Sequence, residues 1–158
     1  MLILLDIDGV MIPAKSWSAP PLLEDGFSVF NSQSVSALNE IIANSNAGLM
    51  LTTSHKYRFS LLKWKEIFKR RGVNFNGLYR LPMNTNRLDR LQEITNWYST
   101  RSVTNEFVIL DDDTSLNGLT AFLKTRLVLT KSLIGLNAQH VQPAVDILKG
   151  HSEVNQKL

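Results

Sequence analysis

The most informative stretch of this chain is LILLDIDGV, residues 2–10. Its four consecutive apolar residues predict a short strand that is buried on both faces, as in the parallel sheet of an α/β domain. Asp6 and Asp8 follow at the carboxyl end of this strand, and ligands of open α/β sheets bind outside that end. Gly9 lets the chain turn away without a Cβ clash. We therefore expect a functional site at Asp6 and Asp8. The alternative is an ordinary Asp-Gly turn with a solvated Asp8.

Two later apolar runs also end in polar side chains. The run GLML at 48–51 leads into Thr52, and the run FVIL at 107–110 leads into three consecutive carboxylates at 111–113. Between these runs, Arg90 opens a pattern of apolar residues at helical spacing. Three adjacent carboxylates repel one another strongly without a cation, which argues against a purely structural role for them.

Taken together, these runs resemble the four motifs of the haloacid dehalogenase (HAD) superfamily, whose members are mostly Mg-dependent phosphohydrolases. In that resemblance the run DIDG at 6–9 is motif I and Thr52 is motif II. Arg90 is motif III, with Arg87 as the reserve, and the carboxylates at 111–113 supply motif IV. The pieces from Arg90 to the final helix look like a small branch without a cap domain, the HAD domains associated with Swiss Army Knife RNA-repair proteins. The similarity covers nearly the whole chain.

The resemblance implies an enzyme that hydrolyses phosphomonoesters through an aspartyl-phosphate. Asp6 would attack phosphorus and carry the phosphoryl group. Asp8 would protonate the departing oxygen and later deprotonate the attacking water. Thr52 would donate a hydrogen bond to the phosphoryl oxygens, and Arg90 would balance their charge.

The same resemblance implies Mg²⁺ as the cofactor, because a carboxylate cannot approach a phosphate dianion unassisted and Mg²⁺ prefers oxygen ligands. Asp6 and Asp112 would hold the ion by their side chains, and the backbone carbonyl of Asp8 would contribute. Asp111 is a further candidate ligand, or else the partner of the motif III arginine. Asp113 could instead cap the turn that follows.

His55 and Trp17 each allow two interpretations. His55 lies just beyond motif II, where it could contact the substrate or relay a proton; the alternative is an exposed residue at the start of a helix. Trp17 could stack on a base or serve as a hydrophobic plug.

The order of the elements predicts a three-layer α/β fold of the Rossmannoid, HAD-like type, with a central, mainly parallel sheet and helices on both faces. The segment 12–30 would form a flap beside the site, too short for a large cap. Residues 1–150 would make a single HAD-like domain and residues 151–158 a frayed tail. We expect strands at residues 2–5, 48–51, 75–81, 107–110 and 126–129, and helices at residues 32–44, 57–71, 90–100, 116–123 and 141–148.

Length and composition narrow the class of protein. A chain of 158 residues, 44% of them hydrophobic, suits one globular domain. No apolar run approaches the roughly 20 residues that span a bilayer, so we expect no membrane partner. The absence of cysteine excludes disulfides, thiolate zinc sites and cysteine nucleophiles. We therefore expect a cytoplasmic protein whose chemistry uses oxygen ligands.

The net charge of +3 conceals a basic block, because residues 56–90 contain ten of the 17 Lys and Arg residues. Such a block favours an anionic partner, and Lys56, Arg58 and Lys63 could follow a nucleic-acid backbone. The alternative is a solvated helix face whose last residues, 69–71, complement the helix dipole.

The phosphorylated substrate would accordingly be a small phosphomonoester or the terminal phosphate of a nucleic acid. The alternative function is a phosphate- or nucleic-acid-binding module that keeps the HAD fold without turnover. The presence of both Asp6 and Asp8 argues against this alternative, because a binding module has no need for an acid-base group.

Overall fold

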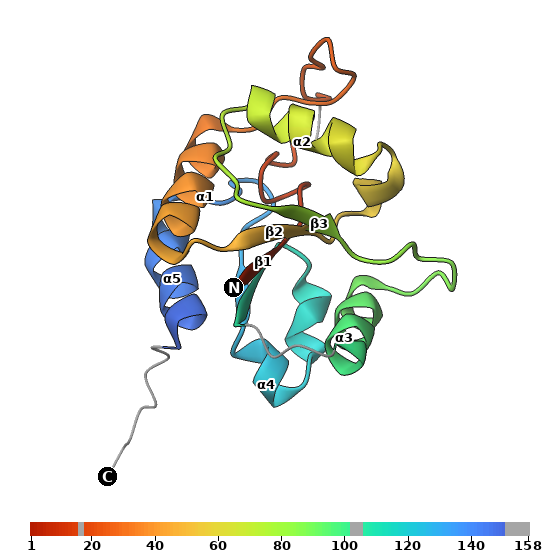
Figure 1. The fold of residues 1–158 in the computed structure, drawn as a ribbon, viewed down its shortest axis with the longest axis vertical. Helices are drawn as coiled ribbons and strands as arrows, with labels where there is room; N and C mark the ends of the chain where they lie inside the picture. Colours follow the sequence, from red (N-terminus) through yellow and green to blue (C-terminus); the bar gives the residue numbers. More distant parts are fainter. Residues whose placement is uncertain (16–17, 102–105, 151–158) are drawn as a thin grey trace.

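The computed structural model describes residues 1–15, 18–101 and 106–150 of the chain. These residues form a parallel sheet of five strands in the order β3-β2-β1-β4-β5 (Figure 1). In the central strand β1, Leu5 pairs with Leu51 on one side and with Leu110 on the other. The predicted α/β fold with a central parallel sheet is confirmed. The strands are β1 (Leu2–Leu5), β2 (Gly48–Leu51), β3 (Leu78–Arg80), β4 (Phe107–Asp111) and β5 (Leu127–Leu129).

Helices cover both faces of this sheet, which gives the three predicted layers (Figure 1). Successive side chains of a strand point to opposite faces. Ile3 and Leu5 of β1 accordingly pack into the core under α1, α2 and α5, whereas Leu4 packs into the core under α3 and α4. No helix in the described ranges is both long and apolar enough to cross a membrane. The helices are α1 (Ser32–Ser45), α2 (Leu61–Arg70), α3 (Arg90–Thr100), α4 (Ala121–Lys124) and α5 (Val141–Lys149), and short 3-10 turns are η1 (Ser54–Tyr57), η2 (Thr114–Gly118) and η3 (Ala138–His140).

The helix predicted at 57–71 is present as α2, but it begins only at Leu61, because Tyr57 ends the separate turn η1. Ser60 separates the two: its hydroxyl accepts a hydrogen bond from the backbone N–H of Lys63 at 3.1 Å, so a new helix starts after it. The predicted helix at 116–123 is likewise divided between η2 and α4. Apolar spacing continues across both breaks, so the spacing by itself could not locate them. The strand expected at 75–81 is shorter, Leu78–Arg80.

A buried arginine fastens the segment between β1 and α1 to the end of α2. Arg71 donates two hydrogen bonds to the carboxylate of Asp25, at 2.6 and 3.0 Å, and one to the carbonyl of Phe27 at 2.9 Å. Its side chain is only 3% exposed, and its guanidinium also lies over the rings of Phe27 and Phe30. The interpretation of Arg71 as part of a solvated helix face is therefore wrong.

Trp17 and the expected frayed tail at 151–158 lie outside the described residues.

Arg70 makes the contrasting contact. It pairs with Glu24 at 3.0 Å, but this pair is exposed, with the Glu24 side chain 90% accessible. The exposed Arg70–Glu24 pair and the buried Arg71–Asp25 pair thus join the same two segments of the chain.

We predict that Asp25→Ala lowers the free energy of unfolding by about 3 kcal/mol, because the Arg71 guanidinium stays buried without its carboxylate partner. Glu24→Ala, the matched control, should lower it by less than about 1 kcal/mol. Urea denaturation at pH 7 measures both variants. Equal losses of unfolding free energy in the two variants would contradict a special effect of burial at the Asp25–Arg71 pair.

The same pair predicts a pH dependence. The hydrogen bonds from Arg71 lower the pKa of Asp25 from 3.8 to about 2. Its stabilising contribution is therefore fully present above pH 3.8 and is lost as the pH falls through about 2. The difference between wild type and Asp25→Ala should shrink only in that range.

Candidate active site

Three carboxylates meet at the carboxyl edge of the sheet, where β1 and β4 end side by side. Asp6 follows β1, Asp111 is the last residue of β4, and Asp112 comes next. An oxygen of each carboxylate lies within 4.8 Å of an oxygen of the other two. Asp6 and Asp111 are buried, and Asp112 is half-buried. The parallel pairing of two strands that are distant in sequence therefore concentrates negative charge at one point.

The start of α3 places an arginine next to this cluster. Asp89 accepts a hydrogen bond from the backbone N–H of Gln92 at 2.8 Å, and the Gln92 side chain accepts one from the backbone N–H of Asp89 at 3.0 Å. This capping box sets Arg90 as the first helical residue. Arg87 is exposed in the preceding loop, so of the two arginines considered it is Arg90 that reaches the site.

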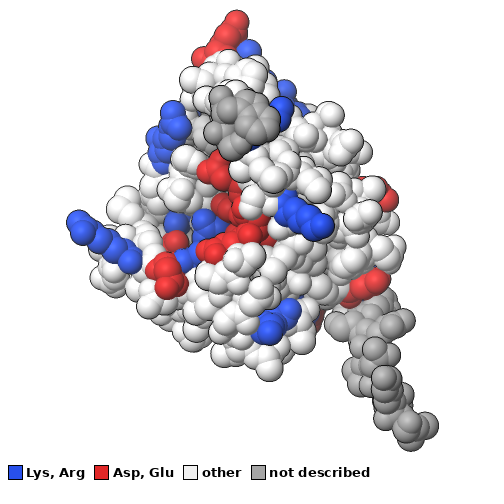
Figure 2. Space-filling model, turned by 180° about the vertical axis from the view of Figure 1, so that it is seen from behind, with Lys and Arg blue, Asp and Glu red and all other residues white. Residues whose placement is uncertain are grey.

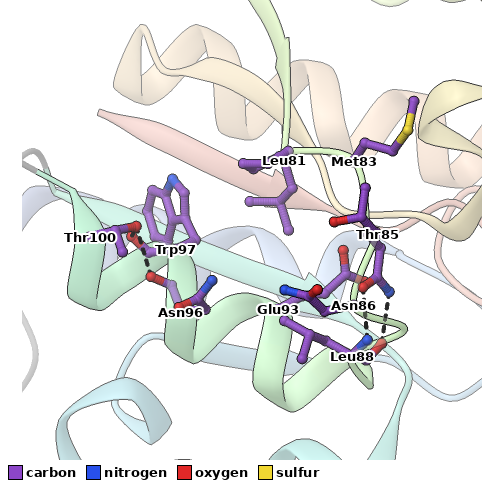
Figure 3. Close-up of a pocket in the computed structure, with 11 residues that line it drawn as sticks. Leu81, Met83, Thr85, Asn86, Leu88, Glu93, Asn96, Trp97 and Thr100 are labelled. Atoms are coloured by element: carbon purple, nitrogen blue, oxygen red, sulfur yellow. Dashed lines mark hydrogen bonds between the residues drawn. The ribbon is translucent and has the colours of Figure 1, made fainter.

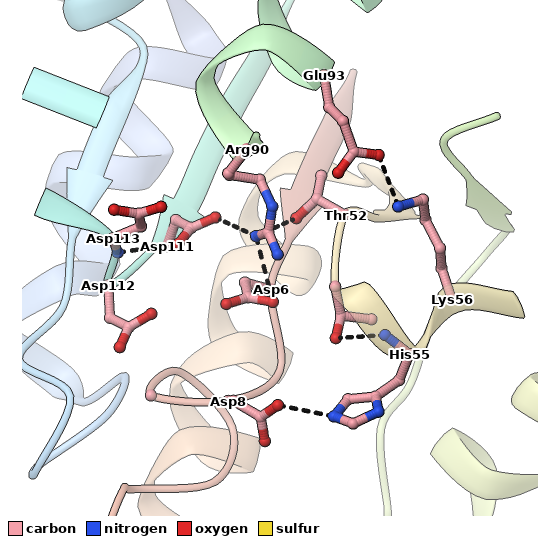
Figure 4. Close-up of polar contacts among 12 residues, drawn as sticks. Asp6, Asp8, Thr52, His55, Lys56, Arg90, Glu93, Asp111, Asp112 and Asp113 are labelled. Atoms are coloured by element: carbon pink, nitrogen blue, oxygen red, sulfur yellow. Dashed lines mark hydrogen bonds and ion pairs between the residues drawn. The ribbon is translucent and has the colours of Figure 1, made fainter. Parts of the chain in front are cut away.

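Arg90 contacts two of the carboxylates and a hydroxyl (Figure 4). Its Nη1 atom lies 2.5 Å from Asp111 and 3.3 Å from Asp6. The same atom lies 3.4 Å from the hydroxyl oxygen of Thr52, which is fully buried just after β2. The structure thus brings together Asp6, Thr52 and Arg90. Asp111 at the end of β4 and Asp112 just after it belong to the same cluster.

The charges in this cluster do not balance. Burial raises the pKa of Asp6 to about 7; Arg90 acts against this rise, and the neighbouring Asp111 adds to it. Burial also raises the pKa of Asp111, again against the effect of Arg90. One guanidinium therefore does not offset the burial of both Asp6 and Asp111. Figure 2 shows acidic side chains gathered in a hollow near the middle of one face of the molecule, with basic side chains beside them.

A hard divalent cation fits this donor set, because all three side chains offer oxygen and carry an excess of negative charge. Asp111 already uses one oxygen for Arg90 and the other for the backbone N–H of Asp113, at 3.0 Å. Asp112 is held by the hydroxyl of Ser132, which donates to its Oδ2 atom at 2.6 Å. Asp6 and Asp112 are consequently better able to hold a cation by their side chains than Asp111 is.

Gly9 leaves the space that the Asp112 carboxylate occupies. A Cβ atom at this position would lie 2.0 Å from Oδ2 of Asp112, and the backbone has a positive φ of 77°. Thr130 fixes the turn by donating a hydrogen bond from its hydroxyl to the Gly9 carbonyl at 2.8 Å. The glycine of the DIDG run is therefore required both by its backbone conformation and by the close approach of the Asp112 side chain.

Asp8 points away from the carboxylate cluster and toward His55 (Figure 4). Its Oδ2 atom lies 2.8 Å from Nε2 of His55, and its side chain is 60% exposed. His55 belongs to η1, where the Thr53 side chain accepts a hydrogen bond from its backbone N–H. Of the two interpretations of His55, the structure favours a residue of the site over a freely exposed one.

Lys56 does not face solvent, contrary to the expectation that it follows a nucleic-acid backbone. It is 3% exposed, and its ammonium group lies 2.7 Å from the carboxylate of Glu93 on α3. Arg58 lies over the rings of Phe27 and Phe59, and Lys63 makes an exposed contact with Glu66. A local charge pattern cannot reveal that an acid 37 positions away in the chain neutralises Lys56.

Two residues beside the site were not predicted from the sequence. Ser132 follows the LVLT run, so a polar group at the end of another strand was the available signal. Glu93 stands three residues after Arg90, a spacing that places both on one side of a helix. Asp113 caps η2 by accepting a hydrogen bond from the backbone N–H of Ser115, which confirms that interpretation.

Comparison with known proteins agrees with this geometry. The family described as the HAD domain in Swiss Army Knife RNA repair proteins matches residues 2–141, which include every strand of the sheet and all the site residues described above. Neither the curated proteins nor the solved structures contain a match. Because the family covers most of the chain, the protein belongs to the HAD domains of the Swiss Army Knife RNA repair type.

Proposed function

We propose that this protein is a Mg²⁺-dependent phosphohydrolase that cleaves phosphomonoesters through an aspartyl-phosphate on Asp6. The observation that carries the proposal is the setting of Asp6 at the carboxyl edge of the sheet, in one cluster with Asp111, Asp112 and Arg90. Membership of the HAD family supports phosphatase chemistry in general terms. The residues suited to hold Mg²⁺ are Asp6 and Asp112, with the backbone carbonyl of Asp8.

The proposed reaction has two steps. In the first, a carboxylate oxygen of Asp6 forms a bond to phosphorus, the bond from phosphorus to the leaving oxygen breaks, and the Asp8 carboxyl gives that oxygen its proton. In the second, water attacks the phosphoryl group, loses a proton to Asp8 and regenerates Asp6. Thr52 and Arg90 hold the phosphoryl oxygens during both steps. The bound cation would neutralise the phosphate and keep Asp6 ionised.

The substrate would bind at an open edge of the molecule, and not in the cavity that lies nearby. This cavity is formed by the loop between β3 and α3 beside Glu93, and it is lined by asparagine side chains and Trp97 (Figure 3). Its volume of about 100 Å³ is below the roughly 300 Å³ of small ligand pockets, so we do not assign it to the substrate. An open site accepts both small phosphomonoesters and the terminal phosphate of a nucleic acid.

The family description supports a nucleic-acid end as the substrate. The basic block gives this substrate less support, because several of its side chains contact other parts of the protein. Besides Lys56, Arg71 and Arg90, Arg80 is also used internally, since it donates to the carbonyls of Lys56 and Phe59. A screen of sugar phosphates, nucleotides and phosphorylated oligonucleotides would identify the substrate class. Tight phosphate binding without turnover of any of them would favour the binding module instead.

We predict that Asp6→Asn abolishes Mg²⁺-dependent phosphate release from an aryl phosphate, because the amide is a poor nucleophile and a weak partner for the cation. Asp113→Asn, the same change at the carboxylate that caps η2, should retain activity. Phosphate release and thermal unfolding are measured on both variants. Wild-type turnover by Asp6→Asn would rule out the covalent mechanism.

Asp8→Asn should slow the hydrolysis of alkyl phosphates by about 10²–10⁴-fold, the usual contribution of general acid-base catalysis. Aryl phosphates should lose less in their first step, because their leaving groups need little protonation. The comparison is made from kcat on one substrate of each kind. Equal losses on both would contradict the assignment of Asp8 as the acid.

Asp112→Ala should weaken Mg²⁺ binding more than Asp113→Ala does. A ligand that binds the native state raises the melting temperature, so Mg²⁺ titration followed by thermal unfolding measures this difference. Asp113→Ala should lower stability by about 1 kcal/mol through the lost cap, yet respond to Mg²⁺ as the wild type does. If Asp113→Ala weakens Mg²⁺ binding more than Asp112→Ala does, the assignment of Asp112 as the metal ligand is wrong.

A further inference from the structure

From the contact between His55 and Asp8 we infer that His55 is a positioning residue, which holds the Asp8 carboxylate in the orientation needed for proton transfer. The inference rests on the proposed function and adds to it a residue outside the four motifs. It begins from one distance, 2.8 Å between Nε2 of His55 and Oδ2 of Asp8.

Contacts of the His55 backbone, of the next residue and of the ring itself fix the position of the imidazole. The Thr53 side chain accepts a hydrogen bond from the His55 backbone N–H at 3.3 Å, and the Lys56 ammonium that follows it is anchored on Glu93. The ring of Phe27 meets the imidazole edge-to-face, with 5.7 Å between the ring centroids. His55 is therefore carried by packed elements and not by a free loop.

Phe27 is itself fixed. Its carbonyl accepts a hydrogen bond from Arg71, and its ring packs against Trp64 at a centroid distance of 5.0 Å. Phe27, which contacts His55, is therefore itself held by contacts with α2 and with Arg71 at the end of that helix.

Asp8 needs such a partner more than Asp6 does. Asp6 is buried and held beside Arg90, whereas the Asp8 side chain is 60% exposed and precedes a glycine with positive φ. An exposed side chain samples several staggered rotamers, and each unproductive rotamer removes the acid from the leaving oxygen. A single hydrogen bond to Oδ2 selects one of them.

The contact engages only one of the two carboxylate oxygens. Within the described part of the chain, Oδ1 of Asp8 has no hydrogen-bond partner, so it can carry the proton that is given to the leaving group and later taken from water. Holding one oxygen and freeing the other is what a general acid requires.

Three variants of His55 test the role of its Nε2 atom. His55→Phe keeps a ring against Phe27 but removes the nitrogen that contacts Asp8, and we expect kcat for an alkyl phosphate to fall by about 10- to 100-fold, as for a misplaced catalytic group. His55→Gln places an amide nitrogen near the former Nε2 position and should recover most of this loss, whereas the shorter His55→Asn should not. Arg58→Gln is the matched control: it changes another neighbour of Phe27 but leaves Asp8 untouched, so kcat should stay the same.

A double-mutant cycle separates positioning of Asp8 from a general structural effect. If His55 acts through Asp8, adding His55→Phe to Asp8→Asn should lower kcat no further, within about twofold. A structural role would instead give the same additional loss in both backgrounds and the same loss on aryl and alkyl phosphates.

The outcomes are distinguishable. If the wild type is active and His55→Phe has the same kcat, the inference is overturned and the proposed function stays intact. The same holds if the kcat losses of His55→Phe and Asp8→Asn are additive. A wild type that releases no phosphate from either substrate would overturn the proposed function, and with it this inference.

Discussion

The contact of Arg90 with Asp6 and Asp111 is the interaction on which the site depends. Two strands that end side by side bring their carboxylates together out of water, and each negative charge raises the cost of the next. The guanidinium offsets part of this repulsion at distances of 2.5 and 3.3 Å, but one positive charge cannot offset three. The remaining excess is what makes the edge of the sheet attractive to a divalent cation. Burial raises the pKa of Asp6 to about 7 against the effect of Arg90, and the charge of Asp111 adds to this rise.

The two carboxylates of the first motif occupy different environments, although only one residue separates them. Asp6 lies inside, beside Arg90, where it is desolvated and oriented. The Asp8 side chain extends to the surface, where a leaving group and a water molecule can both reach it. This division suits the proposed roles of Asp6 as nucleophile and Asp8 as acid, which would act in turn on the same phosphoryl group. Asp8 has less protein around it than Asp6, and its side chain is in contact with His55.

Buried ion pairs away from the carboxylates determine how the surrounding elements meet. The Lys56–Glu93 pair joins η1 to α3, and the Arg71–Asp25 pair joins α2 to the flap. Such pairs add little net stability compared with apolar packing, but breaking one leaves a buried charge without compensation. They therefore specify one arrangement of η1, α3 and the flap, and that arrangement holds Thr52, His55 and Arg90 around the sheet edge.

The sequence alone determined the fold class and the order of its motifs, because these depend on local patterns. An apolar run such as Leu2–Leu5 is buried wherever it pairs, and polar residues at the ends of parallel strands must gather at one edge. It also indicated Asp6, Thr52 and Arg90 as neighbours. The breaks at Ser60 and between η2 and α4 escaped it, because apolar spacing continues across them.

Only the tertiary structure decided which charged groups face each other. The pairs His55–Asp8, Lys56–Glu93 and Arg71–Asp25 join positions 47, 37 and 46 residues apart. No local pattern encodes such a pairing, since it follows from how helices pack on the two faces of the sheet. The composition of residues 56–90 suggested a surface for an anionic partner. In the structure, part of this basic block is instead buried in ion pairs, as at Lys56, Arg71 and Arg90.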